Sequence, residues 1–549
     1  MQATMMSIPM SVQMIMRYGA RHHAASTVAS FDGQGYRRAS YADVAERAAR
    51  LGAALQSLGV ERGDRVATYC WNHQQHLEAY LAVPSIGAVL HTLNTRLFSA
   101  QVAYIADHAD DRVLIADQAL LPQLRDVLPH TPSIKTLIVV GGDGGGIDFA
   151  GEVISYEALL ARHAPLTTWP DLDENMAAAV CYTSGTTGNP KGVVYSHKTI
   201  FVHSLASMGA DTFAISQSDR ILLLPPMFHA NAWGLPYSGW FAGSAFVMPG
   251  AHLQPDKVRA MIASERPTFT AMVPTLLNDL IRSHQQMPLD MASFRVIVSG
   301  GSPVSAALIE RVRDAWNLPV IQGWGMTETS PLCALSAPPV GTPPEEEAQW
   351  RAKSGRPVPG VEVRIVDDSG KRLPHDGRTV GALQLRGPWI ARGYHLQQGE
   401  DVLSPDGWLK TGDVGTIDAR GYVQITDRMK DVIKSGGEWI SSAELEGHIA
   451  RHTEVGEVAV IAVPDPRWEE RPLAIVVPAR GPAARNVIAP GAIRAHLAGL
   501  VAKFWLPEYW AFVDELPKTS VGKIDKRALR EMIADGKIAY RRDDALGAP

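Results

Sequence analysis

A stretch at residues 181–197, CYTSGTTGNPKGVVYSH, combines the groups that phosphate oxygens bind. Hydroxyls, exposed backbone N–H groups and a fixed cation all donate to phosphate. The common nucleotide loop, G-x-x-x-x-G-K-[ST], has a glycine before its lysine and a hydroxyl residue after it. Here Pro190 precedes Lys191 and Gly192 follows it, so we predict a phosphate site of another kind. The residues that we expect to form it are Thr183, Ser184, Gly185, Thr186, Thr187, Gly188 and Lys191.

The flanking residues favour two strands, because AAAVCYTS and GVVYSH are both short and largely apolar. A loop between strands lacks the helix dipole that assists the common nucleotide loop. We expect its hydroxyls and Lys191 to compensate. A turn that only reverses the chain is the alternative, but five phosphate-binding side chains within nine residues favour a binding loop.

Three further stretches have weaker signals. The glycines of SGGSP at 299–303 would admit a flat ligand, although an ordinary strand-to-helix turn fits equally well. QGWGMTETSP at 322–331 contains Glu328, which alone is typical of a solvated loop acid but near phosphates could hold Mg²⁺. LKTGDVG at 409–415 offers Asp413, whose carboxylate can accept both hydroxyls of a ribose.

The elements that must position these residues alternate between strands and helices. Residues 40–59 predict a helix that begins with a capping box at Ser40 and Asp43 and ends at Gly59. Buried strands are predicted at RVATYC, RVLIAD, TLIVVGG, RILLLPP, TFTAMVP and RVIVSGG. This alternation is typical of an α/β body with doubly wound sheets.

The pattern changes near residue 340. The Pro-, Glu- and Gly-rich stretch at 340–360 predicts an exposed loop, and short strands after it predict a small β-barrel-like subdomain. The last part of the chain has its own strands and helices, which indicate a separate α+β domain. We expect a large N-terminal domain over 1–429, with a β-rich part over about 341–429, and a mobile domain over 430–549.

Composition narrows the classes further. The net charge of −5 and the scattered basic residues argue against nucleic acid as a partner. The three cysteines, which have no metal-binding spacing, favour buried reduced thiols and a cytoplasmic location. The Met-rich start favours an amphipathic helix over a signal peptide. Because no window is apolar enough to span a bilayer, we expect at most peripheral membrane contact.

Five motifs occur in the order found in adenylate-forming enzymes: YTSGTTGNPKG, GWGMTE, LKTGD, DRMKDVIKSGGEWIS and PKTSVGKIDK. The chain resembles this superfamily of acyl-CoA synthetases, luciferase-like enzymes and peptide-synthetase adenylation domains along essentially its whole length. PPMFHANAWGLPY at 225–237 is similar to the medium- and long-chain fatty acyl-CoA synthetase branch, whose bacterial members include methylmercaptopropionate-CoA ligases. The resemblance implies ATP, Mg²⁺ and coenzyme A, a carboxylic acid substrate, and a homodimer.

The resemblance also implies roles for individual positions. It places Thr183 and Glu328 at Mg²⁺, Thr327 near the α-phosphate, and Lys523, Thr183, Glu328 and His229 in catalysis. The implied adenine pocket is Gly301, Gln322, Gly323 and Trp324, and the implied ribose site is Asp413 and Arg428. Trp324 stands where many relatives have Tyr, so stacking is kept but a phenolic hydrogen bond is lost. Alone, Lys523 would be typical of a solvated lysine in a glycine loop.

The remaining implied positions concern the acyl group, the hinge and CoA. His229 and Trp233 match positions that face the carboxylate and gate the acyl channel, although a lone His229 would more often be a core histidine. Lys430 matches a hinge about which the C-terminal domain rotates between two half-reactions. The implied CoA path is Lys434, Ser435, Gly436, Gly437, Glu438 and Trp439.

The resemblance implies a fatty acyl-CoA ligase that acts on medium-chain (to long-chain) acids, with a CoA ligase for methylmercaptopropionate or another short or aryl carboxylate as the first alternative. A ligase that loads a carrier protein instead of CoA is a second alternative. A non-catalytic nucleotide-binding regulator is a third, but Lys191, Glu328, Asp413 and Lys523 argue against it.

Overall fold

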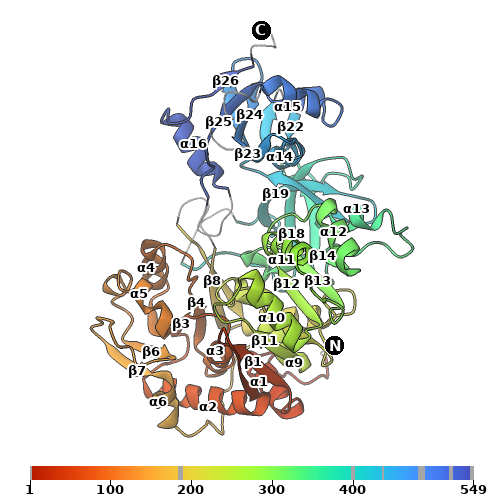
Figure 1. Cartoon of the computed structure of the whole chain (residues 1–549). Coiled ribbons are helices and arrows are strands. Elements are labelled where there is room, and N and C mark those ends of the chain that lie inside the picture. Colours follow the sequence, from red (N-terminus) through yellow and green to blue (C-terminus); the bar gives the residue numbers. More distant parts are fainter. Residues whose placement is uncertain are drawn as a thin grey trace.

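Two largely parallel sheets lie side by side in the lower part of the molecule, and a smaller domain lies at the C-terminal end (Figure 1). This computed structural model describes residues 3–183, 189–396, 402–435, 438–479, 489–518 and 524–543, with the backbone alone at residue 438. It is a mixed α/β fold with a large N-terminal body and a smaller C-terminal domain, as predicted.

Among the described residues, the first sheet has the strand order β7-β6-β5-β3-β4-β8-β9. All its neighbours are parallel except β8 and β9, which form a hairpin. The strands are β3 (Arg65–Tyr69), β4 (Val89–Thr92), β5 (Asp111–Asp117), β6 (Thr136–Val140), β7 (Glu152–Ser155), β8 (Ala177–Tyr182) and β9 (Gly192–Ser196).

The second sheet, over the described residues, has the order β16-β15-β14-β13-β12-β10-β11-β1-β2. Its central strands are parallel, and antiparallel pairs lie at both edges. The strands are β1 (Thr27–Phe31), β2 (Tyr36–Ser40), β10 (Arg220–Leu222), β11 (Ala245–Met248), β12 (Phe269–Met272), β13 (Val296–Gly300), β14 (Val320–Gly325), β15 (Leu332–Leu335) and β16 (Arg356–Pro357).

Helices pack on both sheets, and one hydrophobic core includes residues of both. All residues of α3 are buried, as expected of a helix covered on every side. The helices of the N-terminal body are α1 (Val12–His22), α2 (Tyr41–Ser57), α3 (Gln74–Ser85), α4 (Ser99–His108), α5 (Leu121–Leu124), α6 (Tyr156–Ala161), α7 (His197–Met208), α8 (Ala230–Trp233), α9 (Leu235–Ala242), α10 (Pro255–Glu265), α11 (Pro274–Gln286), α12 (Ala306–Trp316) and α13 (Glu347–Arg351). Short 3₁₀ turns lie at η1 (Gln118–Leu120), η2 (Leu128–His130) and η3 (Thr327–Thr329).

The structure confirms both helices that the sequence predicted near the N-terminus. Ser40 and Asp43 form the expected capping box of α2, and Gly59 follows its end with φ 78°. Helix α1 is amphipathic and buries Val12, Ile15, Met16 and Gly19, which are spaced for one face. In the described part of the chain, none of the helices is both long enough and apolar enough to cross a membrane.

The β-rich part after residue 340 is an antiparallel sheet of β17 (Glu362–Val366), β18 (Gly381–Arg386), β19 (Leu409–Ile417) and β20 (Val423–Arg428). The prediction of a simple exposed loop at 340–360 was wrong in part. This stretch contains α13, whose Ala348 is buried, and strand β16. Helix α13 forms because Ala348 packs into the core beside the second sheet, a long-range contact that outweighs the local Pro and Gly.

The C-terminal domain has a sheet of β22-β21-β24-β25-β26, with β23 paired to β24. Its elements are β21 (Ile433–Ser435), β22 (Glu438–Ile440), α14 (Ser442–Ile449), β23 (Val455–Asp465), β24 (Glu469–Pro478), α15 (Pro490–Leu497), η5 (Lys503–Trp505), β25 (Tyr509–Phe512), α16 (Lys526–Ala534) and β26 (Arg541–Arg542). Two hydrogen bonds connect its first helix to β20: Ser441 Oγ donates to the Thr426 carbonyl, and the Ser442 N–H donates to Asp427.

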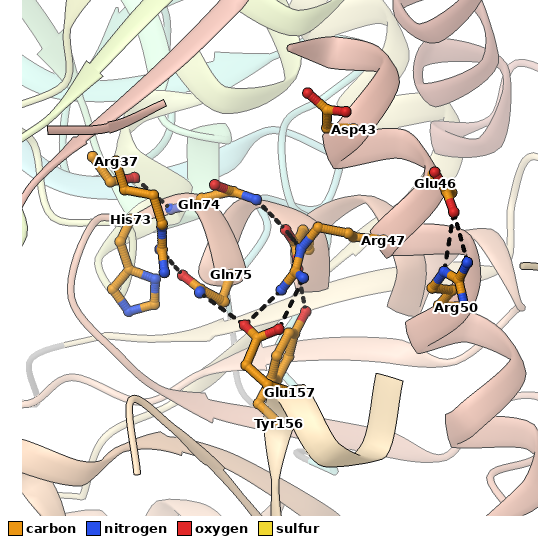
Figure 2. Close-up of polar contacts among 12 residues, drawn as sticks. Arg37, Asp43, Glu46, Arg47, Arg50, His73, Gln74, Gln75, Tyr156 and Glu157 are labelled. Carbon is orange, nitrogen blue, oxygen red and sulfur yellow. Dashed lines mark hydrogen bonds and ion pairs between the residues drawn. The ribbon is translucent and has the colours of Figure 1, made fainter. Parts of the chain in front are cut away.

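A network of polar contacts that includes Arg47, Gln74 and Tyr156 connects α2, α3 and α6 (Figure 2). Glu78, which is fully buried, accepts from Arg47 Nε at 2.7 Å, from Gln74 Nε2 at 2.8 Å and from the Tyr156 hydroxyl at 2.6 Å. Arg47 also forms a bidentate pair with Glu157. Burial raises the pKa of Glu78, and the charge of Arg47 opposes that rise. The ionised form of the buried Glu78 carboxylate therefore depends on Arg47.

Replacing Arg47 with alanine should destabilise the N-terminal body by about 3 kcal/mol, because it leaves a buried carboxylate without its counter-charge. The deficit, measured by denaturant unfolding, should be smaller in mildly acidic buffer than at neutral pH, since a protonated Glu78 needs no counter-charge. Arg50→Ala on the same helix is the control. It removes a partly exposed pair with Glu46 and should change stability by about 0.5 kcal/mol or less. Equal losses of unfolding free energy in both variants would contradict the assignment of Arg47 as the counter-charge of Glu78.

Candidate functional site

The predicted phosphate loop begins and ends on the β8–β9 hairpin. Tyr182 pairs with Gly192, the Thr183 N–H donates to the Lys191 carbonyl at 2.9 Å, and the Lys191 N–H donates to Thr183 Oγ1 at 3.2 Å. The prediction of a loop between two strands is confirmed, because α7 begins only after β9. Ser184, Gly185, Thr186, Thr187 and Gly188 lie outside the described residues.

Glu328 and Lys191 approach the same tyrosine. The Tyr394 hydroxyl donates to Glu328 Oε1 at 2.6 Å, and Lys191 Nζ lies 5.0 Å from the centre of the Tyr394 ring. Glu328 is buried in η3, directly after β14, and its carbonyl accepts from the Ala391 N–H at 2.8 Å. Sequence reasoning missed Tyr394, for which the only signal is an aromatic residue in a polar loop.

Glu328 has a donor set suitable for a hard cation. Among the described residues its Oε2 has no hydrogen-bond partner, so this oxygen can accept a further ligand. Mg²⁺ binds through one or two carboxylates together with substrate phosphates. Glu328, which shares the contact with Tyr394 with Lys191 of the predicted phosphate loop, therefore fits Mg²⁺, and the hydroxyl of Thr183 is also a ligand of the type that Mg²⁺ accepts.

Asp413 is buried, and each of its carboxylate oxygens has a donor. Trp324 Nε1 donates to Oδ2 at 3.0 Å, and Arg428 Nε lies 2.9 Å from Oδ1. Asp413 and Arg428 are cross-strand partners of β19 and β20, while Trp324 comes from β14 of another sheet. The indole thus supplies a hydrogen bond that the sequence did not predict, because the sequence does not show that these two positions meet.

The two glycines at the ends of β13 and β14 permit close backbone approach. A Cβ on Gly300 would lie 2.8 Å from the Gly323 carbonyl oxygen, and Gly301 has φ 80°. The side chain of Gln322 forms hydrogen bonds with backbone groups of the protein. Its Oε1 accepts from the Val304 N–H, and its Nε2 donates to the carbonyls of residues 352 and 353. The Gln322 side chain therefore supports this wall structurally.

A small cavity collects many of the predicted residues. Its volume is about 70 Å³, and its lining is largely apolar. The predicted residues that line it are His229, Trp233, Gly301, Gly323, Trp324 and Thr327. Phe213, Val298 and Leu332, which were not predicted, line it as well. The residues that the sequence assigned separately to adenine, phosphate and acyl binding are therefore brought together in one place.

The backbone beside this cavity is strained. Ala230, Asn231, Ala232, Trp233 and Gly234 all have positive φ, so α8 is a left-handed turn. A left-handed conformation costs non-glycine residues about 1–2 kcal/mol each. The turn starts after His229 and ends at Gly234. A side chain at Gly234 would not fit, because its Cβ would lie 2.5 Å from His203 Cε1.

The predicted residues of the C-terminal region lie apart from this cavity. Lys434 and Trp439 are cross-strand partners on β21 and β22, with Lys434 Nζ 5.4 Å from the Trp439 ring centre and 3.6 Å from Asp368 Oδ2. Ser435 is buried and accepts from Arg471. Lys523, Gly436, Gly437 and the side chain of Glu438 lie outside the described residues.

Lys430 lies at the junction between β20 and the C-terminal domain. Its carbonyl accepts from Arg530 Nη2 at 3.2 Å, and Arg530 also pairs with Asp431 at 2.6 Å. Burial lowers the pKa of Lys430. Arg530 belongs to α16, so a helix of the C-terminal domain contacts the junction.

Cys70, His73 and Asp117 form the group of metal-type ligands found within the described residues. Both ring nitrogens of His73 are engaged, since Nε2 lies 2.7 Å from Asp117 and Nδ1 accepts from the His76 N–H. Burial raises the pKa of the Cys70 thiol well above its usual range. This arrangement caps α3 and does not favour a metal.

Comparisons with known proteins agree with this geometry. The family described as AMP-binding enzyme matches residues 16–395, and the AMP-binding enzyme C-terminal domain matches residues 444–523. The chain is 39% identical to a 3-methylmercaptopropionyl-CoA ligase of Ruegeria pomeroyi, over 97% of this chain and 99% of the relative. It is 39% identical to a medium-chain-fatty-acid–CoA ligase of Ectopseudomonas oleovorans (97% and 98%), and 43% identical to a long-chain-fatty-acid–CoA ligase of Thermus thermophilus (90% of each).

Two solved structures show the same fold. The anthranilate CoA ligase AuaEII in complex with anthranoyl-AMP has a TM-score of 0.83 and 26% identity, over 98% of this chain and 100% of that one. ATP-bound MatB from Rhodopseudomonas palustris has a TM-score of 0.81 and 27% identity, over 96% and 99%.

Proposed function

We propose that this chain, which belongs to the AMP-binding enzyme family, joins a medium-chain fatty acid to coenzyme A with ATP as the energy source. The relatives of this family described above are CoA ligases for medium-chain and long-chain fatty acids and for 3-methylmercaptopropionate. The observation that carries this proposal is the cavity of about 70 Å³. It unites the residues expected at adenine, the α-phosphate and the carboxylate.

The reaction proceeds in two displacements. A carboxylate oxygen attacks the α-phosphorus of ATP, the bond to the β-bridging oxygen breaks, and pyrophosphate leaves. The thiol of CoA then attacks the acyl carbonyl, AMP leaves with the bonding electron pair, and the thiol proton passes to solvent. The protein's contribution is positioning and charge neutralisation rather than covalent chemistry.

The β8–β9 hairpin supports the first displacement. Lys191 and Thr183, which are hydrogen-bonded to each other at the base of the loop, would hold the leaving pyrophosphate. Mg²⁺, when bound by Glu328 and Thr183, would neutralise phosphate charge there. Tyr394 orients the Glu328 carboxylate by its hydrogen bond and also contacts Lys191. The Mg²⁺ requirement, the homodimer and the cytoplasmic location stay predictions.

The nucleoside would be held by Asp413 and Trp324. With one oxygen bonded to Arg428 and the other to Trp324, the Asp413 carboxylate is fixed in orientation. A carboxylate has about four lone-pair sites, and we propose that Asp413 also accepts the two ribose hydroxyls. The Trp324 ring lines the cavity beside Gly323 and Gly301, whose lack of side chains would allow a flat base to approach the backbone.

Trp324→Phe should raise the KM for ATP about tenfold with little change in kcat, because it keeps an aromatic ring but removes one donor to a buried carboxylate. The control is Trp350→Phe, which changes a half-buried indole that contacts Lys353 outside the cavity and should leave the KM for ATP unchanged. Steady-state kinetics with varied ATP provide the measurement. The ribose assignment fails if the two variants behave alike.

The size of the cavity favours a second candidate substrate. A cavity needs roughly 10–15 Å³ to hold one water molecule, so about 70 Å³ admits only about five to seven water-sized groups. A medium-chain acid would require Trp233 or Phe213 to move, whereas an acid the size of 3-methylmercaptopropionate would require less movement. A relative that acts on that acid matches this chain as well as the medium-chain ligase does.

A carboxylate panel tests the activity and the substrate class together. With CoA and ATP present, we expect pyrophosphate release to be fastest with octanoate and to fall by about fourfold for each methylene removed, because each buried CH₂ contributes about 0.8 kcal/mol. A maximum at 3-methylmercaptopropionate or butanoate would favour the second candidate. Pyrophosphate release with no CoA-dependent release of AMP would indicate a carrier-protein ligase, and no pyrophosphate release with any acid would contradict the proposal.

Two variants separate the half-reactions. Lys523→Ala should slow adenylation at least about hundredfold while sparing thioester formation from supplied acyl-AMP, since we propose that this lysine bridges carboxylate and phosphate oxygens. Lys430→Pro should impair the complete reaction because it fixes φ at the proposed hinge. Pyrophosphate exchange and thioester formation measure the two steps. Equal loss of both steps in Lys523→Ala, or full rates in Lys430→Pro, would refute these roles.

A further inference from the structure

The left-handed turn at residues 230–234 needs an external constraint. Its φ values lie between 43° and 76°, and four of its five residues have a side chain. Non-glycine residues adopt this conformation singly rather than in succession. Such a strained run persists only where neighbouring groups hold it in place.

Asn231, the second residue of the turn, makes the side-chain contacts that can hold it. Its side chain is buried, and Oδ1 accepts from Cys181 Sγ–H at 3.1 Å. The Tyr80 hydroxyl lies 3.4 Å from the same oxygen. Asparagine also tolerates positive φ better than most residues. Asn231 therefore meets both requirements of this position, a permissive backbone and a buried acceptor.

The groups that hold Asn231 belong to a strand of the first sheet and to helix α3. Cys181 lies on β8, two residues before Thr183 at the base of the phosphate loop, and Tyr80 lies on α3. The segment that leads into the turn is held from the same side. Tyr80 donates to the Met227 carbonyl, and Asn72 Oδ1 accepts from the Met227 N–H at 2.8 Å.

The turn presents two cavity residues. His229 precedes it and Trp233 is its fourth residue, and both line the cavity. Trp233 Cη2 lies 3.6 Å from the position that a Cβ on Gly300 would occupy, so this ring packs against the glycine wall. A shift of the turn would therefore move both side chains together.

We propose that Asn231 is a positioning residue: its hydrogen bond with Cys181 holds the turn at 230–234 against strand β8. The turn thereby positions His229 and Trp233 at the acyl-binding part of the site. This inference rests on the proposed function, because it assigns the turn to carboxylate binding. The groups assigned to the nucleoside, Asp413 and Trp324, are on other elements. Loss of Asn231 should therefore affect the carboxylate more than ATP.

The decisive variant is Asn231→Gly, because glycine permits positive φ but has no acceptor. It should raise the KM for octanoate about tenfold, flatten the chain-length preference and change the KM for ATP by about twofold at most. Asn231→Ala should do the same. Cys181→Ala should have a similar but smaller effect, and Cys181→Ser, which keeps a donor, should retain wild-type values.

Asn317→Ala is the matched control. Asn317 also has a left-handed backbone (φ 52°), but it is exposed at the end of α12. The control should lose stability without any change in the KM for octanoate. Wild-type KM and chain-length preference in Asn231→Gly would overturn the proposal, and so would equal rises in both KM values.

Amide hydrogen exchange tests the same contact without catalysis. Exchange at residues 229–234 should become faster in Asn231→Gly and Asn231→Ala, but not in Asn317→Ala. Unchanged exchange at 229–234 would overturn the proposal even if the enzyme were inactive. Pyrophosphate release by the wild-type enzyme, measured with the carboxylate panel, tests the proposed function separately from the role of Asn231.

Discussion

The site depends on the two parallel sheets staying fixed against each other, because its residues are divided between them. Thr183 and Lys191 belong to the first sheet, whereas Thr327 and Glu328 follow a strand of the second. Direct hydrogen bonds cross this boundary near the site: the Tyr195 hydroxyl donates to the Thr327 carbonyl at 2.7 Å, and Cys181 contacts Asn231. A relative shift of the sheets would separate the phosphate loop from the cavity.

Buried carboxylates are the second constraint, and each is satisfied by specific donors. Asp413 has Trp324 and Arg428, Glu328 has Tyr394, and Glu78 has Arg47. A buried carboxylate is costly unless it is paired or hydrogen-bonded. The same physical requirement has different uses here. At Glu78 it connects helices that do not line the cavity, and at Asp413 it fixes the orientation of the carboxylate that we propose for ribose binding.

Local patterns predicted much of this architecture, and contacts between distant segments decided the rest. The hairpin around the phosphate loop followed from two apolar runs, and α2 followed from its capping box. Helix α13 was missed because local Pro, Glu and Gly suggested a loop, while the burial of Ala348 depends on packing that no local window contains. Tyr394 and Asn231 were missed for a related reason. Their partners are distant in sequence, and left-handed backbone at Asn231 has no local signature.

All three thiols of the chain, Cys70, Cys181 and Cys333, are buried. Maleimide reagents that act only at accessible sulfur would leave the native protein unlabelled, because burial also keeps these thiols protonated. One cysteine introduced on each domain would then be the sole attachment point there for a fluorophore. The distance between the two dyes would test the proposed rotation of the C-terminal domain in solution, with no native cysteine to remove first.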